Sequence, residues 1–168
     1  MPTSTNPATG EQIATYDEHT AAQVTDLVEQ AHAQHLSWRR TSFDERAAVL
    51  RATADALEAR VDDLAELMAA EMGKPLAAGR SEVEKCAWAC RYYADHGAEH
   101  LADIPLEADR QRSYIHHDPL GVVLAVMPWN FPLWQVFRFA APAIMAGNAG
   151  LLKHASNVTG CALAIEDL

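Results

Sequence analysis

Positive charge, cysteine and long apolar runs are all scarce in this sequence, and each scarcity excludes a class of protein. Thirteen Lys and Arg residues stand against 23 Asp and Glu residues, which gives a formal net charge of −10. A nucleic-acid-binding protein needs clusters of basic side chains to neutralise phosphates, so we exclude nucleic acid as the main partner. The acidic residues lie mostly in segments with helical spacing, where charge is typical of a solvated face.

The three cysteines are Cys86, Cys90 and Cys161. An odd number without regular spacing provides no disulfide framework and indicates a reducing compartment, so we expect a cytoplasmic protein. Cys86 and Cys90 share one face of an expected helix, but no further ligands at metal-site spacing accompany them. We interpret them as small buried apolar residues and predict no metal site.

Apolar residues concentrate between Pro119 and Ile165, where Arg138 and Lys153 are the two charged residues. Prolines and polar residues interrupt this region, so no run of about 18 apolar residues remains and we predict no membrane span. Residues 1–12 are polar and lack the apolar core of a signal peptide. With 168 residues, 49% of them hydrophobic, the chain suffices for one domain or for part of a larger one.

Helical signals dominate the chain before Pro119. Two capping boxes, Thr20 with Gln23 and Ser42 with Glu45, mark helix starts. The predicted helices are residues 20–36, 42–73 and 76–93, the second stopped by the glycine at 73 and the third ended by the glycine at 97. The predicted short strands are residues 13–16 and 113–117, and residues 98–112 are expected to be a connection.

After Pro119 the pattern changes to strand, helix and strand. Residues 121–126 form an apolar run that predicts a strand buried on both faces, as in a parallel sheet. A helix over 133–146, a second strand over 149–153 and a helix from 158 complete the order of a βαβ unit. The final helix lacks a cap, and two strands make no stable sheet. We therefore expect a chain cut off within an α/β fold, with apolar surface exposed on both strands.

A rigid turn, Met127-Pro-Trp-Asn-Phe-Pro132, interrupts the apolar region and indicates a site. Asn130 follows the first buried strand at its carboxyl end, where open α/β sheets bind ligands. Its amide offers two donors without charge, which suits stabilisation of a developing oxyanion. The alternative interpretation is a turn amide that bonds its own backbone.

Two cations are further candidates. Lys153 ends the second strand, where it can meet a cofactor phosphate or ribose oxygen, or simply extend into water. Arg138 lies in the apolar helix, one turn beyond Trp134. A guanidinium buried there needs a partner, either a structural carboxylate or a substrate carboxylate. Glu71 and Lys74, by contrast, flank a helix end and are expected to be solvated.

Six motifs in order carry a family resemblance: Asn6-Pro-Ala-Thr-Gly-Glu11, Glu71-Met-Gly-Lys-Pro75, Pro119-Leu-Gly121, Met127-Pro-Trp-Asn-Phe-Pro132, Ala146-Gly-Asn148 and Leu152-Lys-His-Ala155. Together they resemble the amino-terminal part of the aldehyde dehydrogenase superfamily, in details closest to its succinate-semialdehyde dehydrogenase branch. The resemblance covers the whole chain but roughly the first third of a family member. It implies residues 1–118 as amino-terminal helices with short strands, including the start of an oligomerisation arm. Residues 119–168 would begin an NAD(P)-binding Rossmann-like domain, incomplete here.

The resemblance also implies roles for individual residues. Asn130 would be the catalytic oxyanion amide and, with Trp129, would line the cofactor cleft. Lys153 matches a lysine that contacts the adenosine ribose or its 2′-phosphate. Ser156 stands where strictly NAD-using members often carry a glutamate, so NADP becomes a credible cofactor beside NAD. Arg138 matches an arginine that holds the substrate carboxylate.

The family's nucleophilic cysteine, glutamate base and glycine-rich cofactor turn would lie downstream of Leu168. We therefore predict that the enzyme oxidises succinate semialdehyde or a similar short semialdehyde, that the full-length form is a homo-oligomer, and that this chain alone is inactive. The alternatives are a non-catalytic fragment that associates with a full-length homologue and a truncated product without function.

Overall fold

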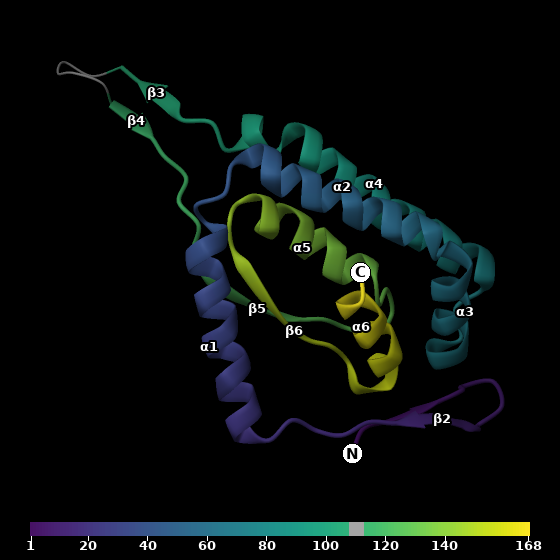
Figure 1. The fold of residues 1–168 in the computed structure, drawn as a ribbon. Helices are drawn as coiled ribbons and strands as arrows, with labels where there is room; N and C mark the ends of the chain where they lie inside the picture. The colour runs from purple at the N-terminus through teal and green to yellow at the C-terminus, as the bar shows by residue number, and fades with distance from the viewer. Residues whose placement is uncertain (108–112) are drawn as a thin grey trace.

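The computed structural model describes residues 1–107 and 113–168, which form helices and short strands in an α/β arrangement (Figure 1). The helices are α1 (Ala21–Trp38), α2 (Phe43–Ala59), α3 (Val61–Met72), α4 (Leu76–His100), α5 (Trp134–Met145) and α6 (Thr159–Glu166), with a 3₁₀ turn η1 (Ser156–Val158). The strands are β1 (Thr3–Thr5), β2 (Gln12–Thr15), β3 (Ile104–Leu106), β4 (Ser113–Ile115), β5 (Val122–Val126) and β6 (Ala149–Lys153).

Local signals placed the first helix starts correctly. Thr20 and Ser42 each accept a hydrogen bond from the backbone N–H three residues on, and each reciprocal side-chain bond is present, so both capping boxes are confirmed. Gly73 ends α3 in the left-handed conformation with φ of 72°, which glycine adopts without a Cβ clash.

Two helix predictions were wrong. The helix expected over 42–73 is two helices, because Arg60, with φ −117° and ψ 20°, leaves helical geometry. Figure 1 shows α3 turned away from the α2 axis, so that α2 packs along α4 while α3 reaches α6. The helix expected to end by Gly97 continues to His100. A Cβ at Gly97 would collide with the Met145 side chain, so this glycine serves close packing of α4 on α5.

The predicted strands and the βαβ order are confirmed. The described residues form three two-stranded sheets, of which β1–β2 and β3–β4 are antiparallel. β3 lies within the segment expected to be a connection, whose residues 108–112 are outside the described part of the chain. β5 and β6 pair in parallel from Val122↔Ala149 to Val126↔Lys153, and α5 is their crossover. The α/β fold class predicted from the sequence is therefore correct.

The strand β5 is less buried than its apolar sequence predicts. Ala125 is 4% exposed, but Leu124 and Val126 are each 65% exposed. The prediction of a strand buried on both faces is wrong for the described residues, because α1 and α5 pack on the β5–β6 pair and leave these two side chains uncovered. The expected apolar surface on the strands is present, and Leu152 contributes to it at 37% exposure.

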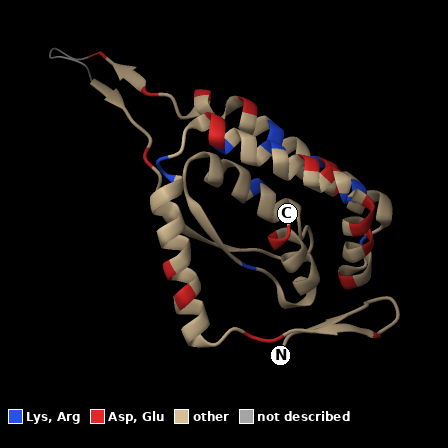
Figure 2. Ribbon diagram, viewed as in Figure 1, with Lys and Arg blue, Asp and Glu red and all other residues tan. Residues whose placement is uncertain are grey.

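One hydrophobic core joins the helices on both sides of Pro119. It contains Leu57, Met68 and Val83 from α2, α3 and α4 together with Leu133 and Cys161 from the later segment. Figure 2 shows charged residues gathered along α2, α3 and α4, whereas β5, α5 and β6 carry few. Within residues 1–107 and 113–168, no helix is both long enough and apolar enough to cross a membrane.

Side chains of α1 and α2 hold the carboxyl end of α5. The Trp38 indole N–H donates to the Ile144 carbonyl at 2.9 Å, and the Arg46 guanidinium donates to the Met145 carbonyl at 3.1 Å. The carboxyl end of a helix carries partly unsatisfied carbonyls and favours positive charge, so both bonds stabilise this end of α5. The crossover helix is thereby fixed against the amino-terminal helices, which sets the position of the turn at its other end.

Candidate functional site

Asn130 lies in the turn after β5, at the carboxyl edge of the parallel pair. Both strands end there, since Val126 is paired with Lys153 and the Met127 N–H donates to the Lys153 carbonyl at 3.1 Å. Asn130 is exposed, and within the described part of the chain no hydrogen bond joins its amide to the turn backbone. The neighbouring Trp129 is 50% exposed. The amide is thus presented at a strand end, the location that the sequence indicated.

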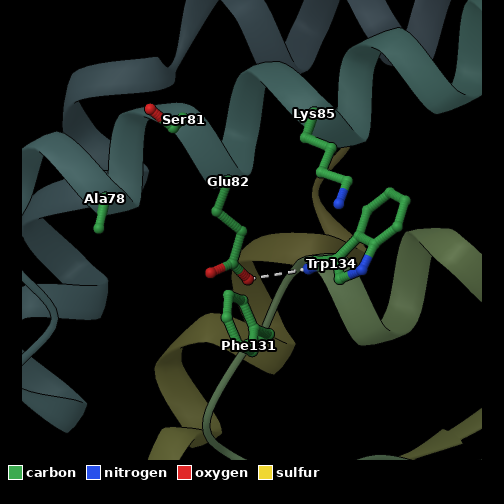
Figure 3. A pocket seen from close by; sticks show the side chains of 6 residues that line it. All are labelled: Ala78, Ser81, Glu82, Lys85, Phe131 and Trp134. Carbon is green, nitrogen blue, oxygen red and sulfur yellow. Dashed lines mark hydrogen bonds between the residues drawn. The ribbon is translucent and has the colours of Figure 1, made fainter.

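The carboxyl end of the turn is held by Glu82, from α4. One carboxylate oxygen, Oε1, accepts from the Leu133 N–H at 3.0 Å and the Trp134 N–H at 2.9 Å, so it caps α5 (Figure 3). The other oxygen forms an ion pair with Lys74. The Lys74 ammonium also lies 4.0 Å from the centre of the Phe131 ring, next to Asn130. The buried Lys74–Glu82 ion pair therefore contacts the turn at Phe131 and at the start of α5.

The expectation that Glu71 and Lys74 are solvated is wrong. Glu71 is 2% exposed and Lys74 8% exposed. The Glu71 carboxylate accepts from the Gly160 and Cys161 N–H groups, each at 2.8 Å, and so caps α6. Buried helix starts leave N–H groups without partners and favour negative charge, which explains why carboxylates are placed there. Sequence reasoning also missed Glu82.

A signal for both glutamates does exist in the sequence. Glu71 continues the apolar stripe of Leu64 and Met68, and Glu82 lies on the stripe of Val83 and Cys86. A carboxylate on the apolar face of a helix must find donors or a cation, since an unpaired buried charge is strongly unfavourable. The helix face on which Glu71 and Glu82 lie predicts that both carboxylates are buried and bonded, whereas their distance from the helix end does not.

A cavity of about 230 Å³ opens between α4 and the turn. Figure 3 shows its lining: Ala78, Ser81, Glu82, Lys85, Phe131 and Trp134. The wall is mostly apolar, and both oxygens of Glu82 are already bonded. The Lys85 ammonium lies 4.2 Å from the centre of the Trp134 ring and brings positive charge to the wall. Such a pocket suits a short apolar chain that carries an anionic group.

The predicted cofactor residues meet at one edge of the sheet. Lys153 is the last residue of β6, and Ser156 opens η1 shortly after it. Trp129 and Asn130 lie in the turn after β5, which ends at the same edge of the parallel pair. Lys153 and Ser156 are exposed. A cation and a hydroxyl at this place fit an anionic group such as a phosphate, and a carboxylate at position 156 would oppose it.

Arg138 is exposed on α5, which corrects the expectation of a buried guanidinium. Its Nη2–H donates to the Gln135 side-chain oxygen at 2.9 Å. The residue faces away from the core because the buried face of α5 passes through Val136, Phe137 and Ala141. Arg138 lies one helical turn after Trp134, which lines the cavity, and its role toward a substrate stays a prediction.

The three cysteine thiols are unsuited to nucleophilic attack. Cys86, Cys90 and Cys161 are each 0% exposed. Burial raises the pKa of the Cys90 thiol to about 12 and raises the pKa values of Cys86 and Cys161 as well. Because the thiolate is the reactive form, these residues act as small apolar groups in the core, which confirms the interpretation of Cys86 and Cys90 from the sequence.

The described residues form a parallel βαβ unit with polar residues after both strand ends, the edge at which open α/β proteins bind their ligands. The comparison with protein families is more specific. The model of the aldehyde dehydrogenase family matches residues 2–168, and the chain therefore belongs to the aldehyde dehydrogenase family.

Relatives of known name support this membership. The chain is 53% identical over 163 residues to a probable succinate-semialdehyde dehydrogenase [NADP(+)] of Synechocystis sp., which covers 97% of the chain and 36% of the relative. It is 52% identical over 172 residues to succinate-semialdehyde dehydrogenase [NADP(+)] 1 of Mycobacterium tuberculosis, covering 100% of the chain and 38% of the relative.

A solved structure of a succinic semialdehyde dehydrogenase from Streptococcus pyogenes, in complex with NADP+, superimposes with a TM-score of 0.95 at 38% identity. The match covers 99% of this chain and 37% of that one. The chain thus spans little more than a third of the length of the relatives it matches.

Proposed function

We propose that this chain is the amino-terminal part of an NADP-dependent aldehyde dehydrogenase that oxidises succinate semialdehyde, or a similar short semialdehyde, to the carboxylic acid. The observation that carries the proposal is the exposed Asn130 amide at the carboxyl edge of the β5–β6 pair. The names of the related proteins support the choice of aldehyde and cofactor.

The chemical role of Asn130 is to donate its amide N–H to an oxygen that gains negative charge. When a thiolate attacks the aldehyde carbon, the carbonyl electron pair moves to this oxygen, and a neutral, fixed donor stabilises it without reorganisation. In the proposed enzyme the thiolate and the carboxylate that activates water come from outside these 168 residues. The buried state of all three cysteines supports that assignment.

The cofactor would be held on the same edge by Trp129, Asn130, Lys153 and Ser156. When bound, oxidised NADP would supply the hydride acceptor for the carbon that the thiolate has attacked. The Lys153 ammonium at the end of β6 and the Ser156 hydroxyl at the start of η1 are both exposed and are suited to an adenosine 2′-phosphate, which favours NADP over NAD. The exposure and charge of these side chains support the proposed cofactor.

The substrate carboxylate would be recognised by positive charge near the cavity. Arg138 lies one helical turn beyond Trp134, whose ring lines the cavity. The apolar wall is suited to the methylene chain of a semialdehyde, and the carboxylate would then lie at the charged rim. Arg138→Leu is expected to raise KM for succinate semialdehyde while leaving an uncharged aldehyde of equal length unaffected.

The test uses the complete gene product and the 168-residue chain side by side. We expect the complete product to reduce NADP with succinate semialdehyde and the chain alone to show no turnover. Asn130→Ala in the complete product is expected to lower kcat by 10²–10³-fold, as loss of an oxyanion donor does. Gln30→Ala, which removes an exposed amide on α1, is the control. Turnover by the chain alone, or full activity of Asn130→Ala, would contradict the proposal.

A second candidate function is association without catalysis. Leu124 and Val126, at 65% exposure each, give β5 an apolar surface that a full-length homologue could cover. Saturable stabilisation of the chain by NADP in a thermal-shift titration favours a formed cofactor cleft. No stabilisation, together with a stable complex between the chain and a full-length homologue, favours association alone.

A further inference from the structure

His154 lies directly after β6 and contacts the turn that carries Asn130. Its Nε2 lies 2.8 Å from the Pro132 carbonyl oxygen, and its Nδ1 lies 2.8 Å from the Ala155 backbone nitrogen. A backbone N–H can only donate, so Nδ1 is the bare, accepting nitrogen. The proton of the neutral ring is therefore on Nε2, which donates to the Pro132 carbonyl.

The surroundings of His154 favour this neutral ring. Burial is the largest cause of a lowered pKa, and the neighbouring Lys153 lowers it further. The Pro132 carbonyl and the Glu71 carboxylate act in the opposite direction but do not outweigh burial. A proton placed on Nδ1 would also point at the Ala155 N–H, so that two donors would meet. The ring is consequently fixed as a donor from Nε2.

The turn is attached to the rest of the fold at both of its ends. At its start, the Met127 N–H donates to the Lys153 carbonyl. At its end, the Pro132 carbonyl accepts from His154, and the next two N–H groups donate to Glu82. Lys153 and His154 are consecutive, so the end of β6 forms hydrogen bonds with the turn both before and after Asn130.

We propose that His154 is a positioning residue, whose bond to the Pro132 carbonyl fixes the turn so that the Asn130 amide is held at the carboxyl edge of the β5–β6 pair. The proposal rests on the function proposed above for Asn130. The proposal also connects Lys153, a proposed cofactor residue, with Asn130, the proposed oxyanion donor, because Lys153 directly precedes His154 at the end of β6. A displaced turn would move the amide away from the oxygen that it must reach.

The first experiment measures the ring and the turn in the chain itself. Long-range ¹H–¹⁵N spectra of ¹⁵N-histidine-labelled protein are expected to show a bare Nδ1 and a protonated Nε2 for His154. In His154→Phe, the backbone heteronuclear NOE of residues 129–131 is expected to fall. His154→Gln, whose amide N–H can reach the same carbonyl, is expected to restore it, and His19→Phe, at an exposed histidine, is the control.

A proton on Nδ1, or unchanged NOE values in His154→Phe, would overturn the proposal. Should His154→Phe fail to fold, the tautomer observed in the unsubstituted chain and the NOE values of His154→Gln decide the question. Both measurements are independent of any catalytic activity.

The second experiment measures kinetics in the complete gene product. His154→Phe is expected to lower kcat on the order of 10- to 100-fold with KM for NADP unchanged, and His154→Gln is expected to recover most of it. If Asn130→Ala lowers kcat by 10²–10³-fold while His154→Phe leaves kcat intact, the positioning role fails and the proposed function stands. If Asn130→Ala leaves turnover intact while the spectra are as expected, the proposed function fails and the fixed turn remains.

Discussion

Lys74 and Glu82 form a buried ion pair, so the losses of stability from removing each partner singly should add up to more than the loss from removing both. Lys74 is 8% exposed and Glu82 is 4% exposed. In Lys74→Met the Glu82 carboxylate keeps two backbone donors, so we expect a loss of about 3 kcal/mol in the free energy of unfolding. In Glu82→Gln the Lys74 ammonium keeps the face of Phe131 but loses its counter-charge, and we expect a loss of about 5 kcal/mol.

The double variant separates charge pairing from helix capping. In Lys74→Met with Glu82→Gln, the glutamine oxygen can still accept from the Leu133 and Trp134 N–H groups, and no charge remains buried. We expect the double variant to lose at least about 2 kcal/mol less than the sum of the single losses, within the range of coupling found for residues in contact. For a domain with a total stability of about 5–15 kcal/mol, each of these changes is large.

Urea unfolding followed by circular dichroism and by tryptophan fluorescence measures these losses, and agreement of the two probes supports two-state analysis. Arg51→Gln breaks an exposed pair with Asp95 and is the matched control, with an expected change below about 1 kcal/mol. Single losses near the control value, or a double variant additive to within about 0.5 kcal/mol, would refute the reasoning.

Three further outcomes can be checked on the same chain. Gly97→Ala is expected to cost about 1–3 kcal/mol in urea unfolding, since its Cβ would collide with Met145, and an equally stable variant would show that α4 and α5 can separate freely. A thiol reagent at pH 8 is expected to modify none of the three cysteines in native protein and all three in urea, because burial raises their pKa values; rapid native labelling would contradict this. Burial lowers the pKa of His154, so the unfolded chain binds more protons between that lowered value and the ordinary value of about 6.5. The stability that His154 contributes is complete above about pH 6.5 and is lost as the pH falls through the folded-state pKa, and His154→Gln should flatten this part of the stability profile.

Features set by neighbouring residues were predictable from the sequence. The capping boxes at Thr20 and Ser42 need only a partner three residues away. The apolar runs of β5 and β6 predict strands without information from distant residues. The position of Asn130 followed from the same local reasoning, because the turn comes directly after a strand.

Features set by distant partners were not predictable. Glu82 bonds Leu133, 51 residues away, and Glu71 bonds Gly160, 89 residues away. Nothing near either glutamate in the sequence reveals which helix start it will meet. The break at Arg60 and the passage of α4 through Gly97 likewise depend on packing between helices that only the folded chain brings together.

The two glutamate caps have a consequence for where a dinucleotide can lie. In many nucleotide-binding folds, the open start of a helix after a strand attracts a phosphate through its unbonded N–H groups. Here the starts of α5 and α6 already bond Glu82 and Glu71, so an approaching phosphate would find these donors engaged and a negative charge in place. These backbone N–H groups at the starts of α5 and α6 are therefore not free to bind a pyrophosphate.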